Sequence, residues 1–182
     1  MLACSALFTA SLTLGSSLLI SGCGAQERPD GGAGLLPAGA SAPDLSALDQ
    51  EGKTRRLSDE RGHPVIVYFY PKDGTPGCTK EACAFRDAWD RFKQAGVQIF
   101  GVSTDDVESH SEFAKEEKIP FPILADPGGA WTKAFGVSTT FGLASRVSFL
   151  IDAQGKVAKV YPDVDPGVHA TDVLNDAAAL KK

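Results

Sequence analysis

The pattern of hydrophobic positions predicts buried strands and amphipathic helices. Residues 65–70 are a continuous run of β-branched and aromatic side chains, which predicts a strand buried on both faces at the centre of a sheet. Thr75 and Pro76 then form an N-cap followed by proline at the first helical position, and Gly96 is suited to end the helix in a left-handed conformation. Helical spacing relates the apolar residues between them, which are Phe85, Ala88, Trp89, Phe92 and Ala95.

Strand and helix patterns alternate through the rest of the chain. A short hairpin around Gly52 is expected before the first buried strand. The later pattern predicts strands at 97–102, 121–124, 146–151 and 156–161, and helices at 107–117, 129–135 and 170–177. The last two strands flank a turn at 152–155, as in an antiparallel hairpin. This order predicts an α/β protein with a thioredoxin-like fold, in which helices flank a central mixed β-sheet.

The first 43 residues have a different character. Residues 1–22 contain no charged side chain and a short apolar run, which is typical of a signal peptide. The run at 19–23 resembles a bacterial lipobox ending at Cys23, so we expect lipidation there, with a general secretory signal as the alternative. The absence of aspartate after Cys23 favours an extracytoplasmic, outer-membrane anchor. Residues 23–43 are rich in glycine and predict a flexible tether before the domain at 44–182.

Length and charge limit the classes of function. The chain has 182 residues, 43% of them hydrophobic, which suits one core. Its net charge is −5, and its lysines and arginines are scattered among acidic residues. Nucleic acid is therefore not expected as a partner.

Cys78 and Cys83 carry the candidate chemistry. Cys78 falls in the first helical turn, where free N–H groups and the helix dipole stabilise a thiolate, the nucleophilic form of cysteine. Cys83 lies five residues later, about 7.5 Å along the axis and roughly 140° around it. A disulfide between them therefore requires local unwinding, which favours a catalytic pair; a strained structural disulfide or a metal site remains as an alternative.

The histidines do not favour a metal centre. His63, His110 and His169 lack ligand spacing, and two cysteines are too few for a structural zinc site. We expect His110 and His169 to be capping or surface residues. No metal and no cofactor are expected.

The segment 71–79 resembles the active-site signature of peroxiredoxins, P-x-x-x-T-x-x-C, and 81–87, with its cysteine, resembles the peroxiredoxin Q branch, also called bacterioferritin comigratory protein. The resemblance runs from about residue 42 to 180 and includes further short motifs. These are Gly101-Val102-Ser103 with Asp105, Ser109-His110, Pro120-Phe121-Pro122, Asp126, Phe135-Gly136-Val137, Arg146, Phe149-Leu150-Ile151-Asp152 and His169.

The resemblance implies specific roles. Cys78 becomes the peroxidatic thiol, Cys83 the resolving thiol, Thr75 a hydroxyl that binds the peroxide, and Arg146 a guanidinium beside the thiolate. Simpler alternatives are an N-cap for Thr75 and a surface position for Arg146. Two pocket positions are implied, Pro71 and Gly77. For Glu81, a first-turn carboxylate is the simplest interpretation.

The predicted function is that of an antioxidant enzyme, a thiol-dependent peroxidase of the atypical 2-Cys type. It would reduce hydrogen peroxide and organic hydroperoxides, receive electrons from a thioredoxin-like dithiol protein, and act as a monomer. Two rivals remain: a membrane-tethered thiol-disulfide oxidoreductase, and a copper-delivering lipoprotein with the same fold. The first normally uses C-x-x-C, which this chain lacks.

Overall fold

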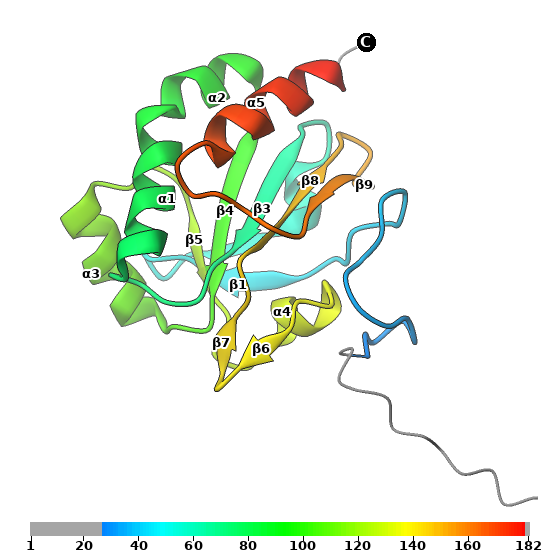
Figure 1. Ribbon diagram of the computed structural model, residues 1–182, viewed down its shortest axis with the longest axis horizontal. Coiled ribbons are helices and arrows are strands. Elements are labelled where there is room, and N and C mark those ends of the chain that lie inside the picture. The colour runs from blue at the N-terminus through cyan, green and yellow to red at the C-terminus, as the bar shows by residue number, and fades with distance from the viewer. Residues whose placement is uncertain (1–26, 181–182) are drawn as a thin grey trace, which may run out of the picture.

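The computed structural model describes residues 27–180, which form a central sheet with helices on both faces (Figure 1). The strand order in the five-stranded sheet is β5 (Ile123–Ala125), β4 (Gln98–Ser103), β3 (Val65–Phe69), β8 (Val147–Ile151) and β9 (Val157–Tyr161). The helices are η1 (Leu57–Glu60), α1 (Pro76–Asp87), α2 (Trp89–Ala95), α3 (Val107–Glu117), α4 (Ala130–Ala134) and α5 (His169–Ala179). The predicted thioredoxin-like α/β fold is confirmed.

β3 is the central strand, as the sequence predicts. All five of its residues are buried, and it pairs in parallel with β4 and antiparallel with β8. β4 and β5 are parallel, whereas β8 and β9 form the predicted antiparallel hairpin. Parallel pairing of β3 with β4 requires a crossover, which α1 and α2 provide.

Two apolar clusters hold the helices to the sheet. On one face, Phe85 and Phe92 pack with residues of α5, whose apolar residues Ala170, Val173, Leu174 and Ala177 are buried. On the other face, Trp131 of α4 and Phe135, which follows this helix, pack with strand residues such as Phe149. α3 packs against β5 and α1 at one edge of the sheet.

The helix predicted from Pro76 to Ala95 is divided in two. Ala88 ends α1 with φ −91° and ψ 1°, and α2 begins at Trp89. The apolar spacing continues through Ala88, so the pattern gave no sign of this break. Gly96 ends α2 in the left-handed region with φ 65°, as predicted.

Two hairpins lie outside the main sheet. β1 (Ser46–Leu48) and β2 (Thr54–Arg56) form the hairpin expected around Gly52. β6 (Thr139–Thr140) and β7 (Leu143–Ala144) form a second hairpin that the sequence did not predict, because its strands are too short for a detectable alternation.

The expected flexible tether is in part packed against the domain. Leu36 is 3% exposed, and its backbone N–H donates to the carbonyl of Phe135 at 2.9 Å. The N–H of Ala42 donates to the carbonyl of Gly155, also at 2.9 Å. The glycine content thus concealed an ordered stretch fixed by backbone hydrogen bonds. The predicted signal peptide at 1–22 and the lipidation site Cys23 lie outside the described residues.

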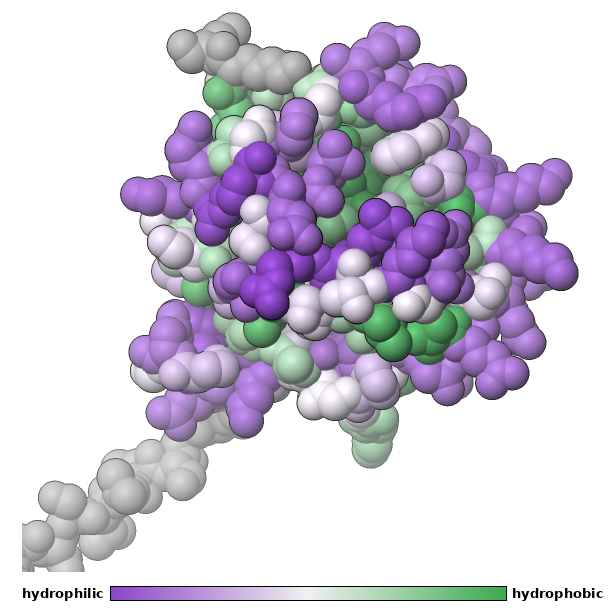
Figure 2. Space-filling view, turned by 180° about the vertical axis from the view of Figure 1, so that it is seen from behind, coloured by the Kyte–Doolittle hydropathy of each residue, from purple (hydrophilic) through white to green (hydrophobic). Residues whose placement is uncertain are grey.

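The surface of the described part is mainly polar. Figure 2 shows hydrophilic residues over most of the face opposite to that of Figure 1, with smaller hydrophobic areas between them. Phe141, between β6 and β7, is fully exposed. Within residues 27–180, no helix combines the length and the hydropathy that a membrane span requires.

Candidate active site at the start of α1

Cys78 is the third residue of α1, where the sequence placed it. β3 ends at Phe69, a loop follows, and Thr75 enters the helix in an extended conformation with Pro76 at the first position. The free N–H groups of this first turn favour a negative charge near the cysteine. Cys78 is a free cysteine and only 1% exposed, so the sulfur is almost enclosed by the loop, the helix and the sheet.

Sheet pairing brings Arg146 to this sulfur. Val147, the first residue of β8, pairs with Phe69, the last residue of β3. Arg146 therefore lies beside the point where the chain leaves the sheet toward Cys78. Its Nη2 donates a hydrogen bond to Cys78 Sγ at 3.2 Å. The alternative of a surface arginine does not hold, since the guanidinium faces inward and its side chain is 19% exposed.

Glu81 is the second side chain that contacts the guanidinium of Arg146. Arg146 Nη1 donates to Glu81 Oε2 in an ion pair, and Glu81 is fully buried. Burial opposes the charge of Arg146, but its contacts with Cys78 and Glu81 together raise the pKa of the guanidinium. Glu81 is thus not the first-turn carboxylate that the sequence suggested, because it is the sixth residue of α1 and is buried. It holds one terminal nitrogen of the arginine while the other contacts Cys78.

Glu81 is poised between its two protonation states. Burial raises its pKa from 4.5 to about 7, although the charge of Arg146 and the hydrogen bond from it work in the other direction. Glu81 Oε1 is buried and lacks a hydrogen-bond partner among the described residues. The carboxyl group is therefore costly to ionise where it lies.

This gives a stability prediction with a defined sign. When the pKa of a carboxyl group is higher in the folded than in the unfolded protein, the protein loses stability as pH rises from the unfolded-state pKa to the folded-state pKa. Relative to Glu81→Gln, the free energy of unfolding of the wild type should fall by roughly 2 to 3 kcal/mol between about pH 4.5 and pH 7. Urea titrations of both proteins at pH 5 and pH 8 measure this difference. A difference that does not change with pH would contradict it.

The three remaining predicted residues lie around the same turn. A Cβ atom at Gly77 would stand 3.2 Å from Arg146 Nη2, so glycine there lets the guanidinium reach the sulfur. Thr75 occupies the N-cap position, yet its hydroxyl makes no capping hydrogen bond and donates to the carbonyl of Lys72 at 3.0 Å. Pro71 is partly buried in the loop that joins β3 to α1.

A buried network fixes this loop to α3. Asp73 accepts hydrogen bonds from the hydroxyls of Tyr70 and Ser109, at 2.7 and 2.8 Å, and its Oδ2 lies 2.7 Å from His110 Nδ1. Burial works against this carboxylate, but the contact with His110 holds the pKa of Asp73 below its usual range. The Asp73 N–H donates to Asp105 Oδ2. Asp73 was part of the sequence signature, but nothing in the pattern indicated its anchoring contacts.

Both histidines expected at the surface or at caps are buried. His110 is 0% and His169 3% exposed. His169 Nε2 lies 2.9 Å from the hydroxyl of Ser148, and burial, with a smaller contribution from Arg146, lowers the pKa of His169 to about 4. It is a neutral packing residue that contacts Phe85 edge to face. The expectation for these two residues was wrong because single polar residues give no periodicity from which burial can be inferred.

Cys83 lies one turn and a half further along α1 and faces another helix. Its thiol donates to Glu117 Oε2 of α3 at 3.3 Å, and it is a free cysteine of intermediate exposure. Burial and the hydrogen bond to Glu117 raise the pKa of this thiol. The structure therefore holds both cysteines reduced and apart, without a structural disulfide between them.

Metal binding finds no support in the described part of the chain. Between residues 27 and 180, no three histidine, cysteine, aspartate or glutamate side chains gather in an arrangement that holds an ion. The copper-delivery alternative requires such a group, and it is not favoured.

The family model described as AhpC/TSA family matches residues 38–160, which include Cys78, Cys83, Glu81 and Arg146. The chain belongs to the AhpC/TSA family. The resemblance to the peroxiredoxin Q and Bcp group is confirmed as well, and the chain is a thiol-dependent peroxidase.

Individual relatives agree with this assignment. The chain is 46% identical to peroxiredoxin Q of Oryza sativa subsp. japonica over 150 residues, covering 81% of this chain and 69% of the rice protein. It is 43% identical to peroxiredoxin Bcp of Escherichia coli over 147 residues, covering 77% and 94%. The crystal structure of peroxidoxin BcpB from Mycobacterium tuberculosis superposes with a TM-score of 0.76 at 35% identity, covering 81% of this chain and 99% of that one.

The relatives correct the predicted localisation. The rice protein is named as chloroplastic, as is a relative from Sedum lineare that is 45% identical over 146 residues. Neither these names nor that of the E. coli protein describe a lipid-anchored or extracytoplasmic protein. The prediction of a membrane-anchored lipoprotein held by Cys23 at the outer membrane is therefore wrong. It rested on a short apolar run and one cysteine, which are weak signals.

Proposed function

We propose that the chain reduces peroxides by an atypical 2-Cys mechanism, with Cys78 as the peroxidatic and Cys83 as the resolving cysteine. The observation that carries the proposal is the hydrogen bond from Arg146 Nη2 to Cys78 Sγ, at the positive end of α1. A fixed guanidinium and the first-turn N–H groups both favour the thiolate over the thiol. Solvent contributes little to this stabilisation, because Cys78 is 1% exposed.

In the first step, the Cys78 thiolate attacks one oxygen of the peroxide and the O–O bond breaks. The sulfur keeps the attacked oxygen as a sulfenic acid, and the other oxygen leaves as alkoxide or hydroxide and takes up a proton. Negative charge therefore moves from sulfur toward the leaving oxygen. Arg146 donates through two nitrogen atoms, one of them held by Glu81, and a cation fixed in this way stabilises the moving charge.

In the second step, Cys83 attacks the sulfenic sulfur. Its thiol loses a proton, an S–S bond forms, the S–O bond breaks, and the released hydroxide combines with the proton as water. The two cysteines are five residues apart on α1, so the helix has to unwind before their sulfurs meet. The end of α1 at Ala88, before α2 begins, limits the segment that needs to unwind.

A relative supports the proposed substrate class. A structure of the Xanthomonas campestris bacterioferritin comigratory protein, 34% identical to this chain, is described in terms of alkyl peroxide reduction. We therefore include organic hydroperoxides beside hydrogen peroxide as substrates. A dithiol protein of the thioredoxin type has to reduce the Cys78–Cys83 disulfide and complete the cycle.

The decisive variant is Cys83→Ser. It removes the resolving thiol, so one equivalent of hydrogen peroxide should oxidise Cys78 once and leave a sulfenic acid that dimedone traps, while turnover with a thioredoxin-type protein as the reductant stops. Mass spectrometry locates the dimedone adduct. Cys78→Ser is the matched control and should give no adduct at position 83. An adduct on Cys83 in that control would reverse the assigned roles.

A further inference from the structure

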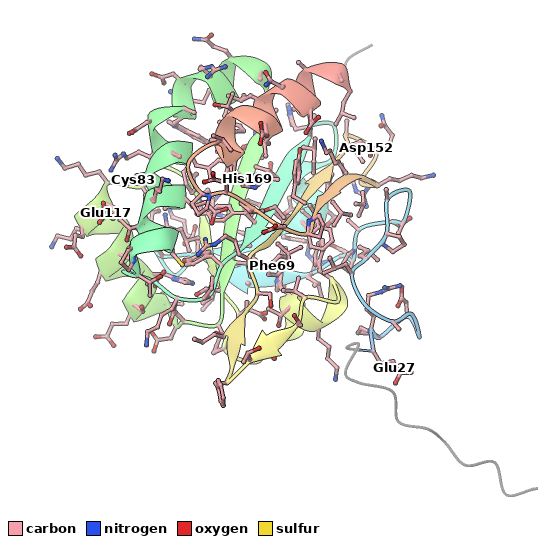
Figure 3. All side chains as sticks on the ribbon, in the orientation of Figure 1. Glu27, Phe69, Cys83, Glu117, Asp152 and His169 are labelled. Carbon is pink, nitrogen blue, oxygen red and sulfur yellow. The ribbon has the colours of Figure 1, made fainter. Side chains whose placement is uncertain are left out.

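Helix α1 is tied to the end of α3 by contacts that the peroxidase reaction does not use directly. Cys83 Sγ donates to Glu117 Oε2 at 3.3 Å (Figure 3). One turn further along α1, Arg86 Nη1 donates to the backbone carbonyl of Glu117 at 2.7 Å and lies 3.9 Å from its Oε2. Glu117 is the last residue of α3, and Lys118 ends the helix with φ 54°. One residue thus receives both contacts.

The charges around Cys83 favour its protonated form. Burial raises the pKa of the thiol, and the hydrogen bond to Glu117 raises it further. The charge of Arg86 acts in the opposite direction, whereas the charges of Glu117 and of Asp87 add to the increase. Only the thiolate is a competent nucleophile. In the helical state, Cys83 is therefore kept both distant from Cys78 and poorly reactive.

We propose that Glu117 is a positioning residue that restrains Cys83 against α3 and thereby slows formation of the Cys78–Cys83 disulfide. This inference deepens the proposed function and rests on it. Cys83 cannot reach the sulfenic sulfur while it contacts Glu117, because α1 is then still helical. The contact therefore exists before the resolution step and is lost in its transition state. An interaction of that kind stabilises only the ground state, so its removal lowers the barrier.

The test follows both steps of oxidation in one experiment. Reduced protein is mixed with excess hydrogen peroxide in a stopped-flow instrument, and tryptophan fluorescence is recorded; Trp89 lies two residues after the end of α1. The rate of the first phase should depend on peroxide concentration, and that of the second should not. In Glu117→Gln, the second phase should be about threefold to tenfold faster, the range expected when a partly exposed hydrogen bond to a charged acceptor is weakened to one with a neutral acceptor. The first phase should be unchanged.

The pH dependence separates positioning from a general loosening of the fold. The rate of the second phase should rise with pH in the wild type and in Glu117→Gln, because only the Cys83 thiolate reacts. The midpoint of this rise should lie at lower pH in Glu117→Gln, because the carboxylate that raises the pKa of Cys83 is absent. Glu116→Gln is the matched control, because it removes the same charge from the neighbouring exposed residue of α3. It should leave both phases and the pH profile as in the wild type. Glu117→Ala, which removes the acceptor as well, should accelerate the second phase at least as much as Glu117→Gln.

The outcomes distinguish this inference from the proposed function. A wild-type protein that forms no Cys78–Cys83 disulfide would overturn the two-cysteine mechanism itself. A wild-type protein that forms the disulfide at the same rate and with the same pH profile as Glu117→Gln would overturn only the role of Glu117. Equal acceleration of both phases, or the same effect in Glu116→Gln, would also overturn it.

Discussion

Replacement of Cys78 by serine is expected to abolish peroxidase turnover. A serine hydroxyl at the same position is not ionised by the first turn of α1 and cannot store an oxygen as a sulfenic acid. Loss of a nucleophile of this kind costs about 10⁴-fold or more in rate. Consumption of hydrogen peroxide by the purified variant, with dithiothreitol as the reductant, measures the loss.

A loss of activity in Cys78→Ser has to be distinguished from a loss of the fold. Cys78 is buried next to Ala82 and Phe85 in the core cluster, so circular dichroism and thermal unfolding must show that the serine variant is folded. Thr79→Ser, a substitution at the next residue of α1, is the matched control and should retain most of the activity. Turnover of a folded Cys78→Ser protein above the background of dithiothreitol alone would exclude Cys78 as the nucleophile.

Replacement of Arg146 by alanine should have the second largest effect. The guanidinium contacts the sulfur of Cys78 at 3.2 Å, and removal of one fixed donor from a developing charge costs about 10²- to 10³-fold in rate. The second-order rate constant of Cys78 oxidation by hydrogen peroxide, measured as the first fluorescence phase, should fall by that factor. Arg146→Lys should recover only part of the loss, because lysine cannot donate to Cys78 and Glu81 through two fixed nitrogens.

Arg146→Ala also leaves Glu81 buried without its partner, and this second effect has to be removed. In a Glu81→Gln protein, Arg146→Ala leaves no buried charge without a partner. The loss of rate that Arg146→Ala still causes there is therefore due to the lost contact with Cys78. Arg91→Ala, an exposed arginine of α2, serves as the control for a change of net charge. An Arg146→Ala rate constant within twofold of the wild type would contradict the role of the guanidinium.

The sequence predicted the order of the main elements because these carry strong periodic signals. The apolar run that became β3 is buried on both faces, and the N-cap, proline and glycine signals gave the beginning of α1 and the end of α2. The position of Cys78 in the first turn followed from these local signals alone. Its proximity to Arg146 did not, because it depends on the pairing of β3 with β8, a contact between distant parts of the chain.

The features that the sequence missed depend on contacts that leave no pattern. The role of Glu81 depends on its contact with Arg146, and His110 contacts Asp73, which lies 37 residues earlier in the chain. The contact of Cys83 with Glu117 joins two helices that were predicted independently. In residues 35–43, glycine and proline indicated a tether, whereas backbone hydrogen bonds hold the segment to the domain.

The central claim concerns the bond that forms between Cys78 and Cys83 after oxidation, and mass spectrometry of a tryptic digest tests it most directly. Trypsin cleaves after Lys72, Lys80 and Arg86, so the two cysteines fall in separate peptides, 73–80 and 81–86. After one equivalent of hydrogen peroxide, we predict that these two peptides are joined by a disulfide. Peptide 73–80 recovered with a free thiol, or joined to a cysteine other than Cys83, would contradict the mechanism.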